Sequence, residues 1–105
     1  MNILTIGGSD TSSGAGIQSD IKTFSDFNAY GFTVITAITS QNTKHISNIE
    51  PVSTKSLKTQ LDSILSDFHI DGIKIGMVYN SDIIKIIHKK FRNSHVPIIV
   101  DPIIK

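Results

Sequence analysis

Small and polar residues crowd the stretch GSDTSSGAGIQSD, residues 8–20, which holds three glycines and four serines. The backbone N–H groups of such a loop, when they lead into a helix N-terminus, can hydrogen-bond a polar ligand. Two common phosphate-binding motifs do not fit. A P-loop needs a lysine after its second glycine, and a dinucleotide fingerprint needs a third glycine where Ser19 stands. The alternative interpretation is a capped turn, with Ser12 or Ser13 as the N-cap and glycines for tight packing.

Three longer side chains could contact a small ligand. The amide of Gln41 both donates and accepts hydrogen bonds, so it could pair with an aminopyrimidine edge, although a loop glutamine facing water is the simpler interpretation. Met77 could form an apolar wall beside a flat ring, or it could simply pack in the protein interior. Asp20 flanks the apolar stripe of an expected helix, and it points either to solvent or into a site.

The sequence offers few other catalytic or metal-binding groups. Asp101 follows an expected strand, where a carboxylate could hold Mg²⁺ or its waters, or could simply form a turn before proline. The four histidines are dispersed, and no serine-histidine-aspartate pattern with a nucleophile elbow is present. Because the chain has no cysteine, disulfides, thiolate zinc sites and cysteine nucleophiles are excluded within it.

Composition excludes several classes of protein. The chain has 105 residues, of which 39% are hydrophobic and 18% charged, as in soluble globular proteins. The net charge is +1, and no basic cluster exceeds residues 88–90, which disfavours nucleic-acid binding. No apolar run approaches the roughly 20 residues that span a bilayer, and the start MNILTIGG lacks the basic region of a signal peptide. We therefore expect a cytoplasmic protein with no membrane partner.

Hydrophobic periodicity predicts alternating strands and helices. Runs of β-branched residues predict strands, at 2–6, 32–39, 71–75 and 96–101. Apolar stripes at helical spacing predict helices, at 17–24, 57–68 and 81–92, with Ser53 or Thr54 and Ser81-Asp82 as caps. The polar stretch 40–51 is expected to be a connection. The order β-α-β-α-β-α-β implies parallel strands joined by right-handed crossovers, hence an α/β fold.

The same order predicts where a ligand would bind. Open parallel sheets bind ligands at the carboxyl ends of their strands. Four segments directly follow predicted strands and should meet there: 7–16, 40–43, 76–77 and 101–102. We therefore expect one site built from these segments.

The segments GSDTSSGAGIQSDIKTF, YGFTVITAITSQNT, IKIGM and VDP, in this order and spacing, closely resemble the bacterial hydroxymethylpyrimidine/phosphomethylpyrimidine kinases of thiamine biosynthesis. These enzymes belong to the ribokinase-like superfamily. The resemblance implies a three-layer α/β/α fold with a mainly parallel sheet. It also implies phosphorylation of 4-amino-5-hydroxymethyl-2-methylpyrimidine and then its monophosphate, with ATP and Mg²⁺ as cofactors. The partner is thus a small molecule, and a homodimer is a possible assembly.

The resemblance also implies roles for single residues. Gly8 falls where the loop backbone touches the substrate, and Asp20 falls near the substrate. Gln41 matches the glutamine that hydrogen-bonds the aminopyrimidine, and Met77 matches a methionine that packs on the ring. There are two departures from the family pattern: Ser13 stands where a glycine is common, and DPIIK replaces the usual DPVM.

The family's chains are much longer, so residues 1–105 are expected to be the N-terminal part of a ribokinase-like kinase domain. The uncovered last strand also predicts a truncated chain. By resemblance, most of the ATP site and the group that activates the substrate hydroxyl would lie beyond residue 105. No catalytic residue is therefore expected here, and the chain alone is expected to be inactive. Two alternatives remain: a pyridoxal kinase, whose branch shares GSDTS-x-GAG although QNT favours the pyrimidine kinases, and a vestigial, non-catalytic binding module.

Overall fold

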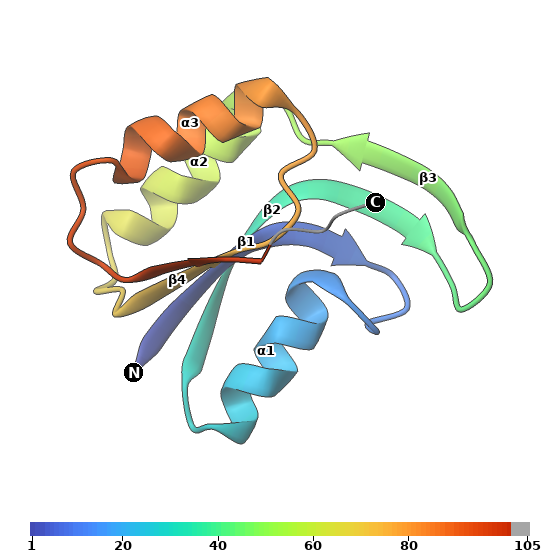
Figure 1. Cartoon of the computed structure of the whole chain (residues 1–105), viewed down its shortest axis with the longest axis horizontal. Coiled ribbons are helices and arrows are strands. Elements are labelled where there is room, and N and C mark those ends of the chain that lie inside the picture. Colours follow the sequence, from blue (N-terminus) through green and yellow to red (C-terminus); the bar gives the residue numbers. More distant parts are fainter. Residues whose placement is uncertain (102–105) are drawn as a thin grey trace.

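The computed structural model describes residues 1–101 as a five-stranded sheet with helices on both faces (Figure 1). The strands are β1 (Asn2–Asp10), β2 (Tyr30–Gln41), β3 (Ile46–Pro51), β4 (Gly72–Ile75) and β5 (Ile98–Val100). The helices are α1 (Gly16–Asp26), α2 (Thr54–Leu65) and α3 (Ser81–Phe91). Helix α1 covers one face, and α2 and α3 cover the other. The predicted α/β fold is confirmed. Residues 102–105, which belong to the DPIIK segment that departs from the family's DPVM, lie outside the described residues.

The sheet is mainly parallel, with the strand order β3-β2-β1-β4-β5. Strand β1 pairs in parallel with both β2 and β4, and β4 pairs in parallel with β5. After β1, the chain adds β2 and β3 on one side of β1 and then adds β4 and β5 on the other side. This reversal is a topological switch point, where open α/β sheets form a crevice at the carboxyl ends of their strands.

The expected connection at 40–51 is wrong over its second half, because β3 pairs antiparallel with β2 along that stretch. All six residues of β3 are exposed. An edge strand of this kind is held by backbone hydrogen bonds to its neighbour, so it lacks the apolar alternation by which a half-buried strand is recognised.

Strand β1 also continues beyond its predicted end at Ile6. Gly7 pairs with Ile35 whereas Gly8 pairs with Ala37, so Thr36 is an extra residue on β2 and forms a bulge. Thr36 is fully buried, and its hydroxyl donates a hydrogen bond to the Met77 carbonyl at 2.7 Å. The bulge thus ties the segment after β4 to the middle of the sheet.

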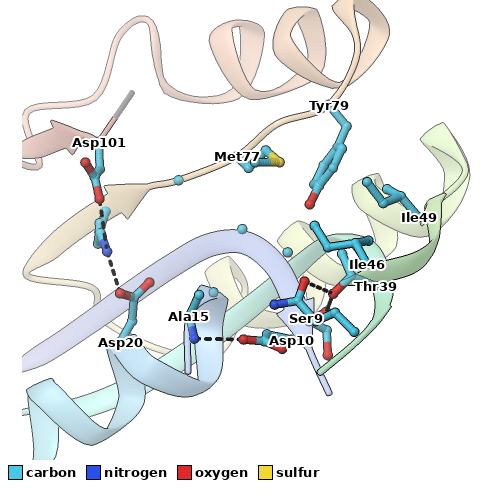
Figure 2. Close-up of a pocket in the computed structure, with 16 residues that line it drawn as sticks. Ser9, Asp10, Ala15, Asp20, Thr39, Ile46, Ile49, Met77, Tyr79 and Asp101 are labelled. Carbon is cyan, nitrogen blue, oxygen red and sulfur yellow. Dashed lines mark hydrogen bonds and ion pairs between the residues drawn. The ribbon is translucent and has the colours of Figure 1, made fainter. Parts of the chain in front are cut away.

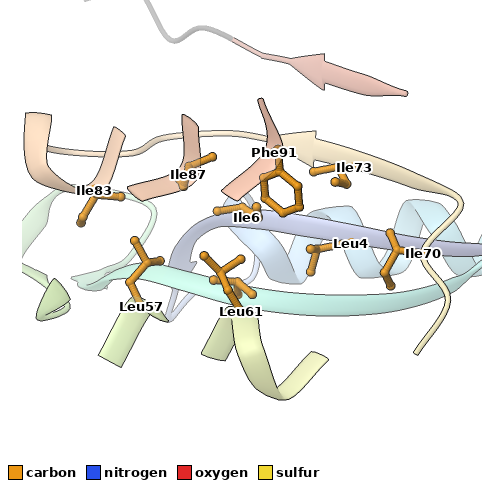
Figure 3. Close-up of a cluster of buried hydrophobic side chains, with 10 residues drawn as sticks. Leu4, Ile6, Leu57, Leu61, Ile70, Ile73, Ile83, Ile87 and Phe91 are labelled. Atoms are coloured by element: carbon orange, nitrogen blue, oxygen red, sulfur yellow. The ribbon is translucent and has the colours of Figure 1, made fainter. Parts of the chain in front are cut away.

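The main hydrophobic core lies between the sheet and the helices α2 and α3 (Figure 3). Leu4 and Ile6 of β1 are fully buried there. The predicted helical stripes supply the opposite side, with Leu57 and Leu61 from α2 and with Ile83, Ile87 and Phe91 from α3. This packing gives the central strands a rigid support.

Of the two helices on this face, α2 has the N-cap predicted from the sequence and α3 does not. Ser53 caps α2, accepting a hydrogen bond from the Ser56 N–H at 3.0 Å, as predicted. The cap of α3 is Asn80 rather than Ser81-Asp82, and its Oδ1 accepts from the Ile83 N–H at 3.0 Å. Asparagine is as good an N-cap as serine or aspartate, so the prediction fails by only one position.

The β5 edge of the sheet is exposed. Ile99 and Val100 retain 70% and 61% of their accessible surface. Within residues 1–101, no helix is long and apolar enough to cross a membrane.

Candidate ligand-binding site

A pocket of about 270 Å³ lies at the carboxyl ends of the central strands (Figure 2). Its lining comes from all four segments that were expected to meet there. The residues singled out from the sequence also line it: Gly8, Asp20, Gln41, Met77 and Asp101. The volume is slightly below the usual range for small-molecule pockets, so it suits a ligand with one ring.

Asp10 determines the path of the loop between β1 and α1. Its Oδ1 accepts hydrogen bonds from the Ser12 N–H at 2.8 Å and the Ser12 hydroxyl at 2.7 Å, while its Oδ2 accepts from the Ala15 N–H at 2.8 Å. Burial opposes the charged form, but these hydrogen bonds outweigh it and lower the pKa of Asp10 below its ordinary value. The carboxylate is therefore charged at neutral pH.

The predicted capping of α1 by Ser12 or Ser13 is wrong. The N-cap is Ala15, which has no capping side chain, and Asp10 binds the Ala15 N–H instead. The role of Asp10 was not predicted, although the spacing of Asp10 and Ser12 is typical of an Asx-turn.

The loop requires a glycine at one position in particular. Gly16 has φ +64°, and a Cβ atom there would lie 2.3 Å from the Gly8 carbonyl oxygen. Any side chain would therefore separate the start of α1 from the end of β1. Ser13, with φ +62°, also lies in the left-handed region, which explains physically why a glycine would suit that position.

Gln41 is oriented by two threonines. Its backbone N–H donates to Thr11 Oγ1 at 2.8 Å, and its side-chain Oε1 lies 3.1 Å from Thr39 Oγ1. The single proton of the Thr39 hydroxyl goes to the nearer acceptor, the Ser9 carbonyl at 2.7 Å, which joins the end of β2 to the end of β1. The backbone of Gln41 is thus held beside the glycine-rich loop, and its side chain lines the pocket next to Thr39.

Asp20 belongs to a network of charges on another side of the pocket. Its Oδ2 accepts a hydrogen bond from the Thr5 hydroxyl at 2.7 Å, and its Oδ1 forms an ion pair with the Lys74 ammonium. Lys74 Nζ also lies 3.7 Å from Asp101 Oδ2 (Figure 2). Sequence reasoning missed Lys74, although it lies within the quoted segment IKIGM.

This network does not fit a resident magnesium ion. The Lys74 ammonium lies between the carboxylates of Asp20 and Asp101, where a metal ion would have to bind. Nowhere in the described part of the chain do three or more acidic or histidine side chains gather at metal-binding distance. Asp101 therefore faces a cation of the protein itself.

The remaining side of the pocket is largely apolar. Met77 and Tyr79 come from the segment between β4 and α3, and Ile46 and Ile49 come from β3. Because β3 was not predicted, neither isoleucine was expected at the site. The pocket thus combines apolar surfaces with hydrogen-bonding groups, which suits a flat heteroaromatic ligand.

Solved structures similar to this chain include kinases of the ribokinase-like class. The phosphomethylpyrimidine kinase of Clostridium difficile 630 has a TM-score of 0.90 and 44% identity, over 99% of this chain and 48% of that one. The pyridoxal kinase of Staphylococcus aureus, solved with pyridoxal, has a TM-score of 0.87 and 37% identity, over 99% and 40%. The fold and the pocket thus define a small-molecule kinase architecture.

A family model described as phosphomethylpyrimidine kinase matches residues 10–105, and the chain belongs to this family. The hydroxymethylpyrimidine/phosphomethylpyrimidine kinase of Bacillus subtilis (strain 168) is 41% identical over 101 residues. The match covers 95% of this chain and 37% of that protein. The chain therefore spans little more than a third of the length of this curated relative, and the expected family is confirmed.

Proposed function

We propose that this chain forms the substrate-binding side of a hydroxymethylpyrimidine/phosphomethylpyrimidine kinase of thiamine biosynthesis. Its ligands are 4-amino-5-hydroxymethyl-2-methylpyrimidine and the corresponding monophosphate. The observation that carries the proposal is the meeting of Gly8, Gln41 and Met77 on one pocket of single-ring size. Residues 1–105 act as one domain in this proposal.

Each of these residues has a chemical part in recognition. The side-chain amide of Gln41 can donate to a ring nitrogen and accept from the exocyclic amino group of the pyrimidine. The backbone at Gly8 allows close approach, and the thioether of Met77 packs on the ring. Asp20 acts through Lys74, because both of its oxygens already have protein partners.

The phosphoryl donor in this proposal is ATP with Mg²⁺. Phosphoryl transfer depends on positioning and on charge compensation around the γ-phosphate. The chain aligns with 37% of its B. subtilis relative. We therefore expect the chain by itself to bind the pyrimidine and, when mixed with MgATP, to form no phosphorylated product above background.

Titration calorimetry with hydroxymethylpyrimidine tests the proposal. We expect Gln41→Ala to weaken binding about tenfold, because it removes hydrogen bonds to a largely desolvated ligand edge. Thr59→Ala, an exposed change in helix α2 that does not line the pocket, should bind like the wild type. Equal affinities of the wild type and Gln41→Ala would refute the site assignment.

Pyridoxal is the competing ligand, because a pyridoxal kinase of Staphylococcus aureus shares this fold at 38% identity. The same calorimetric titration with pyridoxal decides between the two. Pyridoxal binding tenfold tighter than the pyrimidine would make the pyridoxal kinase interpretation the better one.

A further inference from the structure

Tyr79 has no role in the site described so far, yet it forms part of the pocket wall. Its ring packs against the backbone of Gly8: a Cβ atom on Gly8 would lie 3.0 Å from Tyr79 Oη and 3.4 Å from Cε2. In Figure 2 the ring points into the pocket, with Met77 on one side and Ile49 on the other. The tyrosine thus approaches the same glycine that the ligand is proposed to touch.

The backbone of Tyr79 is strained. Its φ is +65°, which is uncommon for a residue with a bulky side chain. The Asn80 N–H donates to the Val78 carbonyl at 2.8 Å, so a hydrogen bond spans the three residues centred on Tyr79. A positive φ under such a bond is typical of the rare, strained form of γ-turn. Strained residues of this kind persist where the surroundings hold them, and they cluster at functional sites.

The structure shows what holds the turn in place. Asn80 caps α3 directly after it, and Ile83 anchors that helix in the core with no exposed surface. Before the turn, the buried Thr36 hydroxyl holds the Met77 carbonyl. The segment is therefore fixed at both ends. A tyrosine, whose ring lines the pocket, stands at a backbone position where a glycine would be less strained.

The chemistry of the side chain suits ligand recognition. Burial raises the pKa of Tyr79, so the phenol stays protonated at neutral pH and can donate a hydrogen bond. Its ring and the Met77 thioether are both surfaces on which a flat heteroaromatic ring packs well. The amide of Gln41 is available to the polar edge of the same ring.

We propose that Tyr79 is a ligand-contacting residue that sets the specificity of this pocket for one flat heteroaromatic ring. Its side chain packs on the bound ring, and its position over Gly8 limits the size of the ligand. This inference rests on the proposed function, since hydroxymethylpyrimidine is the ring used to test it.

The tyrosine content of the chain allows a direct test. There are two tyrosines and no tryptophan, so Tyr30→Phe leaves Tyr79 as the only fluorescent residue of these types. Tyr30, at the start of β2, is 67% exposed and does not line the pocket. In Tyr30→Phe, added hydroxymethylpyrimidine should change the fluorescence, with the Kd found by calorimetry. In Tyr79→Phe, where only Tyr30 is left, the signal should stay constant.

Two substitutions separate recognition from structural support. Tyr79→Gly removes the ring and relieves the positive φ, so it should melt no lower than the wild type. It should bind hydroxymethylpyrimidine about tenfold more weakly, as when one stacking aromatic is removed from a base. It should also bind 4-aminoquinazoline, a two-ring analogue that the wild type excludes. Tyr79→Phe keeps the ring and should retain most of the affinity.

The outcomes distinguish the two proposals. Unchanged or tighter pyrimidine binding by Tyr79→Gly, or a constant fluorescence signal in Tyr30→Phe, would overturn the role of Tyr79 while the Gln41 result still supports the proposed function. If the glycine variant fails to fold, the fluorescence titration decides alone. If the wild type binds no hydroxymethylpyrimidine at all, both proposals are overturned.

Discussion

Two neighbouring glycines of the first loop look equivalent in the sequence but differ in the structure. Gly16 combines φ +64° with a Cβ position 2.3 Å from a backbone oxygen. At Gly14, an added Cβ would find its nearest atoms at 3.9 Å, which is ordinary contact. Only Gly16 therefore needs to be a glycine.

Replacing these glycines by alanine should have unequal effects. Gly16→Ala should destabilise the protein by about 3 kcal/mol, because a left-handed backbone costs about 1–2 kcal/mol and the clash with Gly8 adds to it. Gly14→Ala is the matched control and should change stability by less than about 0.5 kcal/mol. Urea denaturation measures both, and equal midpoints would contradict the loop geometry.

Residue types indicated the candidate site, but their partners could not be foreseen. Gln41 and Met77 follow predicted strands, so topology alone placed them at one edge of the sheet. The ion pair of Lys74 with Asp20 and the contact of Tyr79 with Gly8 join residues that are far apart in the sequence. Such pairs depend on tertiary packing, and no local pattern reveals them.

Among the elements, the apolar strands and the amphipathic helices were predictable, whereas the polar edge strand β3 was not. The four predicted strands and three predicted helices all occur. The helices and the strands β1, β2 and β4 have buried residues that leave a periodic or apolar pattern, whereas β5 is exposed and was recognised from its run of β-branched residues. Strand β3 is exposed along its whole length, and its sequence ISNIEP has neither an apolar run nor an apolar–polar alternation. It nevertheless supplies Ile46 and Ile49 to the pocket.

The loop between β1 and α1 should be sensitive to acid through Asp10. The folded-state pKa of Asp10 lies below its ordinary value of 3.8. Its contribution to stability is therefore fully present above that ordinary pKa and is lost as the pH falls through the lowered one. Asp10→Asn should be less stable at neutral pH and should lose less stability than the wild type between about pH 6 and about pH 3.

Thermal melts over this pH range check the prediction. Asp26→Asn, an exposed change at the end of α1, serves as the control and should keep the pH profile of the wild type. An Asp10→Asn profile parallel to that of the wild type would show that the carboxylate does not hold the loop.

For the whole molecule, the strand order explains why the pocket lies where it does. The sheet grows from β1 toward β2 on one side and toward β4 on the other, and the pocket opens over these three strands. The hydrophobic core formed by these strands with α2 and α3 supports them and so holds the pocket walls in fixed positions. The fold thus positions a recognition site independently of the phosphoryl donor.

Nuclear magnetic resonance of the labelled chain, titrated with hydroxymethylpyrimidine, tests the central claim most directly. We predict saturable shifts of the backbone amides of Gly8 and Met77 and of the Gln41 side-chain amide. The amides of Leu61 and Lys89, in helices α2 and α3 away from the pocket, should not move. Shifts confined to those helices, or no saturable shift at all, would contradict a pyrimidine site at the carboxyl ends of β1, β2 and β4.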